Sequence, residues 1–351
     1  MMFLATILAV MLAPSARAAD AASAASAPQR APIAAPSVAM LKDRFIETTE
    51  SDAAERTKIL RQLAKTPPVS GQDVANLFDL FSRFTDRYTR ESVMASLALL
   101  EPGSPQLEPL FMTYLKQPEP EAQLFGINGA FRLRSRAALP IIREIAGRKF
   151  GATAVTETTM MSERNAWWTQ YEALSVLAQW EGEKAYPLIE RKGLESAKVG
   201  AILGRWYWRQ TLPKLRGWTE SGDLLSSERA ALAVASPIDP ADARATRAQM
   251  LALLRDAKVD AEIRHHLALK IGASSNDEEA ADLVRQHDAA ATDGERLYWA
   301  AAAFSSRSPK VIPLLVRYAR QTGDETLRKG AAVQLADMVG EAEAHNLIAP
   351  K

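Results

Sequence analysis

The chain has 351 residues, of which 47% are apolar and 24% are charged, and it contains no cysteine. This composition indicates a globular protein of one large domain or two small ones, and it excludes disulfides, thiolate metal sites, iron–sulfur clusters and cysteine nucleophiles. Lys and Arg number 43 against 42 Asp and Glu, a balance that argues against a nucleic-acid-binding protein, which needs a strongly basic surface.

Residues 1–18 have the pattern of a secretory signal peptide. An uncharged apolar run over residues 1–13, too short to cross a bilayer as a helix, is followed by the small-x-small cleavage site Ala16-Arg17-Ala18. No Lys or Arg precedes the apolar run, which departs from the usual pattern, and the alternative is a buried N-terminal helix. We expect cleavage after Ala18, a periplasmic or secreted protein, and no integral membrane segment after cleavage.

Residues 19–39 form a compositionally biased spacer. Of these 21 residues, 16 are Ala, Ser or Pro, so the segment has too little bulky apolar surface to fold. We therefore predict a flexible, disordered connection between the signal peptide and the folded body.

From Leu41 onward the apolar residues follow a helical period, and almost no strand alternation is present. Residues 40–90 are predicted to form an N-terminal helical cap. Within it, Ser70 with Asp73 three residues later resembles a helix start, and further on Ser104-Pro105 offers a cap residue followed by proline.

Two landmarks recur along the rest of the chain and predict a repeated helix pair. One is an acidic residue that opens a helix in each unit, at Glu91, Glu121, Glu163, Glu195, Glu228, Asp260, Asp293 and Asp324. Their spacings are 30, 42, 32, 33, 32, 33 and 31 residues. The one long spacing, of 42 residues, is explained by an insertion near residues 150–162. The other is a proline with apolar neighbours in the first turn of the partner helix, at Pro109, Pro140, Pro187, Pro213 and Pro313.

With these landmarks, residues 91–351 resemble the HEAT and HEAT-like (armadillo-like) repeat family. The best matches to its acidic, branched-apolar, arginine pattern are Asp260-Ala-Glu-Ile263-Arg264 and Asp324-Glu-Thr-Leu327-Arg328. The resemblance implies an all-α protein, an α-solenoid of stacked antiparallel helix pairs with a right-handed superhelix. Each pair buries its apolar face against its neighbours, and small residues let adjacent helices approach closely. A closed ring of helix pairs, as in some carbohydrate-acting enzymes, is the main alternative.

No sequence motif for catalysis or metal binding is present. HExxH, phosphate-binding glycine loops, GxSxG and calcium loops are missing from the sequence. The only histidine pair, His265-His266, points in two directions on a helix and cannot bind one ion as an i, i+4 pair would. The sequence therefore predicts no catalytic residue, no metal and no cofactor.

The middle of the chain is basic and aromatic. Six of the seven tryptophans lie between residues 167 and 218, and residues 121–220 hold 15 Lys and Arg against 10 Asp and Glu. Most of these tryptophans fit apolar helix stripes, such as Trp167 and Trp180, and we expect them in the core. Aromatic and arginine enrichment is typical of binding hot spots.

Four residues are the candidate binding residues: Trp168, Arg205, Trp208 and Arg209. Trp168 shares a helix face with polar residues, and Trp208 falls opposite the apolar stripe that ends at Trp206. In the family that the chain resembles, the helix after the proline helix lines the concave surface, which would place Trp168, Arg205 and Trp208 in one groove. The alternative is that these side chains pack between units.

Taken together, the sequence predicts an exported, noncatalytic scaffold or adaptor that binds a protein or peptide in a concave groove centred on residues 163–216. One alternative is a glycan-binding or cell-wall-associated protein that stacks sugars on tryptophan and binds anionic groups with arginine. The other is an all-helical polysaccharide-acting enzyme, which no motif supports.

Overall fold

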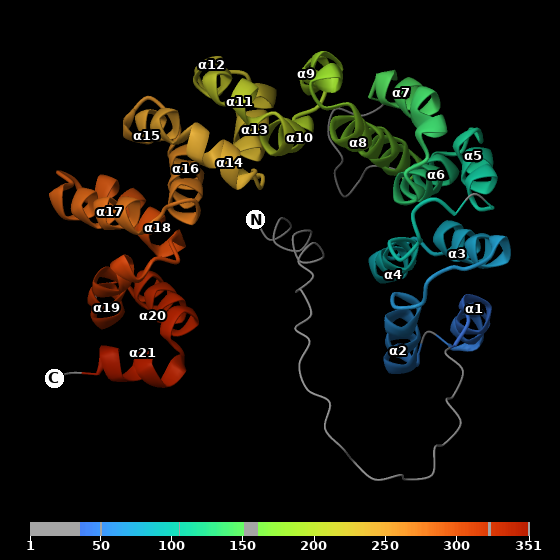
Figure 1. The fold of residues 1–351 in the computed structure, drawn as a ribbon, viewed down its shortest axis with the longest axis horizontal. Helices are drawn as coiled ribbons and strands as arrows, with labels where there is room; N and C mark the ends of the chain where they lie inside the picture. Colours follow the sequence, from blue (N-terminus) through green and yellow to red (C-terminus); the bar gives the residue numbers. More distant parts are fainter. Residues whose placement is uncertain (1–35, 50, 105, 151–160, 322–323, 350–351) are drawn as a thin grey trace, which may run out of the picture. The chain divides into compact units, whose positions relative to one another are not determined.

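The computed structural model describes residues 36–49, 51–104, 106–150, 161–321 and 324–349, and 78% of them are helical, with no strand among them (Figure 1). The prediction of an all-α fold is therefore confirmed. The α-helices are α1 (Val38–Glu47), α2 (Ala53–Leu63), α3 (Gly71–Arg83), α4 (Arg87–Leu97), α5 (Glu108–Leu115), α6 (Pro120–Leu133), α7 (Leu139–Gly147), α8 (Met161–Glu181), α9 (Tyr186–Gly193), α10 (Val199–Trp206), α11 (Trp208–Thr211), α12 (Leu215–Glu220), α13 (Leu224–Ala235), α14 (Pro240–Ala245), α15 (Arg247–Arg255), α16 (Ala261–Ala273), α17 (Asp277–Ala289), α18 (Asp293–Ser305), α19 (Ile312–Arg320), α20 (Glu325–Val339) and α21 (Glu341–Ile348).

The helices pack as sequential pairs. The paired helices in contact are α1–α2, α3–α4, α5–α6, α7–α8, α9–α10, α12–α13, α15–α16, α17–α18 and α19–α20. The later member of each pair, called here the second helix, also contacts the second helix of the next pair, from α2 through α4, α6, α8, α10, α13 and α16 to α18. Each pair thus buries one face against its partner and others against its neighbours in the chain (Figure 1).

Five of the eight acidic landmarks lie at helix starts, as predicted. Asp260 and Asp324 are the N-cap residues of α16 and α20, and their carboxylates accept hydrogen bonds from backbone N–H groups of the first turn. Glu121, Glu163 and Asp293 fall in the first turns of α6, α8 and α18. The carboxylates of Asp260 and Asp324 thus satisfy free N–H groups, and acidic residues near a helix start interact favourably with the positive end of the helix dipole.

The other three landmarks were predicted wrongly. α4 and α13 begin a turn earlier than expected, because Asp86 and Asp223 accept the hydrogen bonds of the first turn in place of Glu91 and Glu228. Glu195 precedes α10 altogether. The repeat spacing predicts a helix near each landmark, but the cap side chain decides the first residue of that helix.

Four of the five prolines occupy the first turn of a first helix, as predicted, where the missing N–H has no partner to lose. Pro213 instead lies in a 3₁₀ turn, Leu212–Lys214, directly before α12. At Ser70 the predicted helix start is confirmed as a reciprocal capping box with Asp73. Ser104 is not a cap, since α5 begins only at Glu108.

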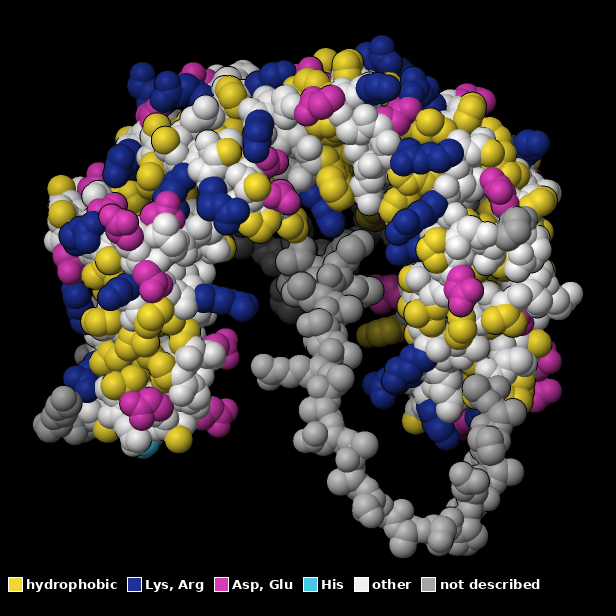
Figure 2. Space-filling view, in the orientation of Figure 1, with side chains coloured by type: hydrophobic (Ala, Val, Ile, Leu, Met, Phe, Trp, Pro, Cys, Tyr) yellow, Lys and Arg dark blue, Asp and Glu magenta, His cyan; other side chains and the backbone are white. Residues whose placement is uncertain are grey.

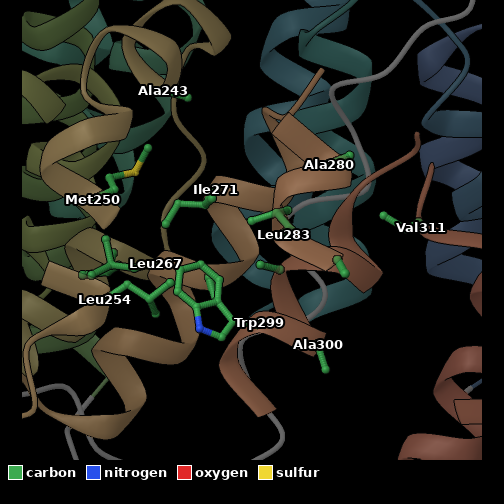
Figure 3. Close-up of a cluster of buried hydrophobic side chains, with 14 of the residues drawn as sticks. Ala243, Met250, Leu254, Leu267, Ile271, Ala280, Leu283, Trp299, Ala300 and Val311 are labelled. Carbon is green, nitrogen blue, oxygen red and sulfur yellow. The ribbon is translucent and has the colours of Figure 1, made fainter. Parts of the chain in front are cut away.

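Each hydrophobic core is shared by successive pairs. In the C-terminal half, Met250, Leu254, Leu267, Leu283 and Trp299 come from four helices, α15 to α18, and all are buried. Figure 3 shows the Trp299 indole beside Leu254 and Leu267. The stability of each pair therefore depends on its neighbours.

Glycines bring the second helices into close contact. A Cβ atom on Gly200 or Gly204 of α10 would overlap the backbone of α13, and one on Gly272 of α16 would overlap the carbonyl oxygen of Ala302 in α18. The prediction that small residues let helices of adjacent units approach closely is confirmed at these two contacts. A larger residue would force the helices apart.

Several predicted segments lie outside the described residues: the signal peptide over residues 1–18, nearly all of the spacer over residues 19–39, and the insertion at residues 151–160. The first helix begins at Val38, capped by Ser37, so it takes in the last two residues assigned to the spacer. Within the described part of the chain, no helix has the length and apolar character needed to span a bilayer.

Candidate functional site

Trp168 lies on the surface of α8. Its side chain is 40% exposed. Its ring packs edge-on against Trp167 and Tyr171, with centroids 4.9 Å and 5.7 Å apart, so the indole is held by its neighbours although it faces solvent. Of the two alternatives left open by the sequence, the 40% exposure agrees with the polar helix face rather than with full burial between units, and the role of Trp168 in binding stays a prediction.

Arg205 and Trp206 lie at the end of α10, the second helix that packs against α8. The Arg205 guanidinium carbon is 4.9 Å from the centroid of the Trp206 ring, which is 37% exposed. Burial raises the pKa of Tyr171 to about 12, and nearby Arg205 acts in the opposite direction. Trp168, Tyr171, Arg205 and Trp206 are called here the aromatic cluster, which spans two adjacent second helices.

The prediction that Trp208 faces a groove is wrong. Its side chain is fully buried, and its indole N–H donates a hydrogen bond of 2.8 Å to Thr246 Oγ1. The cause is a break in the helix: α10 ends at Trp206, Tyr207 adopts φ −134° and ψ 39°, and α11 begins at Trp208. The rotation of 100° per residue does not continue through this break, so Trp208 turns inward and Trp206 is left exposed.

Arg209 is placed differently from the prediction as well. Its Nε atom forms an ion pair at 2.7 Å with Oδ1 of Asp242, a residue of α14. No hydrogen bond, ion pair or ring contact joins Arg209 or Trp208 to the aromatic cluster within the described ranges. Of the four predicted residues, the structure therefore brings only Trp168 and Arg205 to one cluster.

A pocket of about 610 Å³, which was not predicted from the sequence, lies at the end of α6 beside Trp180 of α8. We call it the arginine pocket; it is lined by Ala98, Leu100, Pro102, Phe131, Arg132, Arg134, Arg136 and Trp180. The signal in the sequence is three arginines at alternate positions. On a continuous helix such residues point apart, but α6 ends at Leu133 and the chain turns there.

One wall of the arginine pocket is aromatic. Phe131 stacks on Trp180 with ring centroids 5.8 Å apart. The guanidinium of Arg136 lies 5.0 Å from the Trp180 centroid and donates a hydrogen bond of 2.9 Å to the Trp180 carbonyl oxygen. Trp180, expected in the core, is half-buried at this wall.

The lining of the arginine pocket carries positive charge only. No Asp or Glu lines it, and its three arginines form no ion pair with any carboxylate of the described residues. Over the face seen in Figure 2, basic and acidic side chains are otherwise interspersed. The pocket is therefore a local excess of positive charge in a chain that is close to neutral.

Glu172 of α8 is under the electrostatic influence of one arginine of the pocket. It stands one helical turn after Trp168 on the same face of α8. Burial raises the pKa of its carboxyl group, and the nearby Arg132 acts to lower it. Arg132 thus lies within electrostatic reach of the α8 face that carries Trp168.

Lys270 of α16 is a half-buried lysine next to Trp208. Its ammonium group donates a hydrogen bond to the Ser236 carbonyl oxygen and lies 5.1 Å from the Trp208 ring centroid. Burial lowers its pKa from 10.5 to about 7. Between these two pH values the unfolded chain holds this proton more tightly than the folded protein, so the folded protein gains stability as pH rises.

Lys270→Met is therefore expected to change the pH dependence of stability. Below pH 7 the variant avoids the cost of burying a charge, and we expect it to gain on the order of 2 kcal/mol relative to the wild type. This advantage shrinks as pH rises through the interval from 7 to 10.5, since the wild type loses the charge there. Urea unfolding at several pH values measures it, with the exposed Lys310→Met as control; a difference that is constant with pH would contradict the prediction.

No group of three or more His, Asp or Glu side chains placed for a metal ion is found in the described residues. His266, which stands beside His265, has a pKa lowered chiefly by burial. What the arrangement offers is a surface of aromatic rings and guanidinium groups.

No protein-family model matches the sequence, and a search of curated proteins finds no relative.

Proposed function

We propose that this protein is a noncatalytic scaffold or adaptor that binds a protein or peptide on the exposed side of its second helices. The observation that carries the proposal is the aromatic cluster, in which two adjacent, contacting helices each present an exposed tryptophan: Trp168 on α8, and Trp206 beside Arg205 on α10. Tryptophan and arginine are the residues most enriched in interface hot spots. Exposed indoles held in place by their neighbours lose little conformational freedom on binding.

The architecture that goes with this function is an α-solenoid of HEAT-like repeats with a right-handed superhelix. Its support is the sequential packing of helix pairs and the chain of contacts between second helices. In such a stack the second helices line the concave face, and the aromatic cluster would lie there. We further propose that the protein is exported to the periplasm or secreted, on the basis of the signal-peptide pattern in residues 1–18.

A selection of random twelve-residue peptides displayed on phage tests the proposal. Peptides enriched on the purified protein are expected to bind Trp168→Ala and Trp206→Ala at least tenfold more weakly, because each variant loses a ring at the centre of the contact. Leu224→Ala is the matched control, since this side chain is 83% exposed at the start of α13, away from the cluster. Recovery of no binding peptide, or equal binding to all variants, would refute the assignment.

Glycan binding is the second candidate, because the exposed face of Trp168 could stack on a sugar ring. In this case an acidic polysaccharide such as alginate would bind the protein, whereas no displayed peptide would. The affinity for the polysaccharide would fall in Trp168→Ala. The same variants therefore distinguish the two functions.

A further inference from the structure

We propose that the arginine pocket recognises a carboxylate side chain, so that the partner is an acidic peptide segment with an apolar residue next to its Asp or Glu. This inference rests on the proposed function and identifies the chemistry of the partner. Four features of the pocket support it: the convergence of the arginines, their unpaired charge, the apolar wall, and the backbone that holds one of them.

The end of α6 brings the three guanidinium groups together. Arg132 is in the last turn of α6, Arg134 is the residue at its C-cap, and Arg136 begins the following 3₁₀ turn. All three line one pocket. Because the chain reverses at Arg134, side chains that would diverge on a helix surround the same space.

The charge of these groups is not neutralised by the protein. None of the three arginines forms an ion pair with a carboxylate of the described residues, whereas Arg209 is paired with Asp242 and Arg317 with Asp288. A guanidinium group binds a carboxylate through two parallel hydrogen bonds, with a geometry that a lysine cannot match. The pocket therefore suits a planar carboxylate.

The other wall of the pocket suits an apolar side chain. Leu100, Phe131 and Trp180 contribute carbon surface beside the arginines. A volume of about 610 Å³ exceeds the space of a single carboxylate. An acidic side chain with an apolar neighbour fills both parts of the pocket.

A peptide fits this pocket better than a sugar does. Sugar rings stack on free indole faces, whereas Trp180 is already packed against Phe131 and the Arg136 guanidinium. Arg132 of the pocket also acts electrostatically on Glu172, which stands one helical turn after Trp168 on α8. One extended peptide could thus place an acidic residue in the pocket and an apolar residue on the aromatic cluster.

The backbone at Arg134 points to the same use. With φ 57° and ψ 31°, Arg134 is the only residue other than glycine with positive φ in the described ranges. Glycine is the residue that this left-handed position favours at a helix end. An arginine kept there at a cost in stability is consistent with a role for its side chain.

The experiment uses the peptides selected as above and compares three proteins. One protein, the pocket variant, combines Arg132→Gln, Arg134→Gln and Arg136→Gln. The control variant combines Arg61→Gln, Arg244→Gln and Arg307→Gln, which replace three exposed arginines without ion pairs in the described residues. We expect the selected peptides to be enriched in Asp and Glu and to bind the pocket variant at least tenfold more weakly, with a smaller dependence on salt, while the control binds as the wild type does.

The outcomes separate this inference from the proposed function. Peptides that are not acidic, or that bind the pocket variant normally while losing affinity in Trp168→Ala, overturn the inference and leave the proposed function standing. Alginate that binds through the arginines, where no peptide does, overturns both. If the triple variant does not fold, Arg134→Gly decides: its thermal midpoint should not fall, and unchanged peptide affinity would refute the role of Arg134.

Discussion

Gly272→Ala is expected to lower the free energy of unfolding by about 2–4 kcal/mol. The added Cβ would overlap the Ala302 carbonyl oxygen and carbon in α18, and it would also lie within 3.0 Å of the Ser305 Cβ. Because the overlapping atoms belong to the α18 backbone, they cannot rotate away as a flexible side chain would. The helices α16 and α18 must therefore separate. Their separation would also loosen the core around Trp299, which both helices help to build.

Gly330→Ala is the matched control for this substitution. Gly330 lies inside α20, and nothing stands within 4 Å of an added Cβ. Here alanine is expected to stabilise the protein by about 0.5–1 kcal/mol, because glycine loses more backbone entropy in a helix. Urea denaturation followed by circular dichroism measures both variants, and equal effects of the two would show that α16 and α18 are not in close contact.

Trp208→Ala is expected to cost about 3–5 kcal/mol, the range for removing a fully buried large aromatic side chain. The change empties a large volume in the core and removes the hydrogen-bond partner of Thr246 Oγ1. It also removes the ring against which the Lys270 ammonium group packs. All three effects act in the same direction.

Trp168→Ala provides the comparison, with an expected cost below about 1 kcal/mol, because its ring is already 40% exposed. Acrylamide quenching adds a second measurement with the Trp→Phe variants. Trp168→Phe should remove a readily quenched, red-shifted part of the emission, and Trp208→Phe a protected, blue-shifted part. A reversed order would contradict the burial of these two residues.

The helix pairs could be predicted from sequence because their signals are local. A proline in the first turn and an acidic residue near a helix start act on backbone N–H groups within the same turn, as Pro140 and Asp260 do. The first residue of a helix was less predictable where two carboxylates near the helix start could each act as the cap. Asp86 caps α4 although Glu91 fits the repeat spacing, because the cap depends on side-chain geometry rather than spacing.

The candidate site was only partly predictable for a different reason. Trp168 lies within a long uninterrupted helix, so its face could be extrapolated from the positions of its neighbours. Trp208 follows a break at Tyr207, and no residue type there announces that the helix stops. The same holds for the arginine pocket, which exists because Arg134 adopts a conformation that a sequence pattern assigns to glycine.

The most direct test of the account is ¹⁹F NMR of the protein labelled with 5-fluorotryptophan, with each of the seven tryptophans assigned by substitution. A selected peptide is titrated in and the seven signals are followed. The account predicts that the signals of Trp168, Trp180 and Trp206 shift, while those of Trp208 and Trp299, buried in the core, stay in place. Shifts confined to Trp299, or no shift at saturation, would show that the partner binds elsewhere.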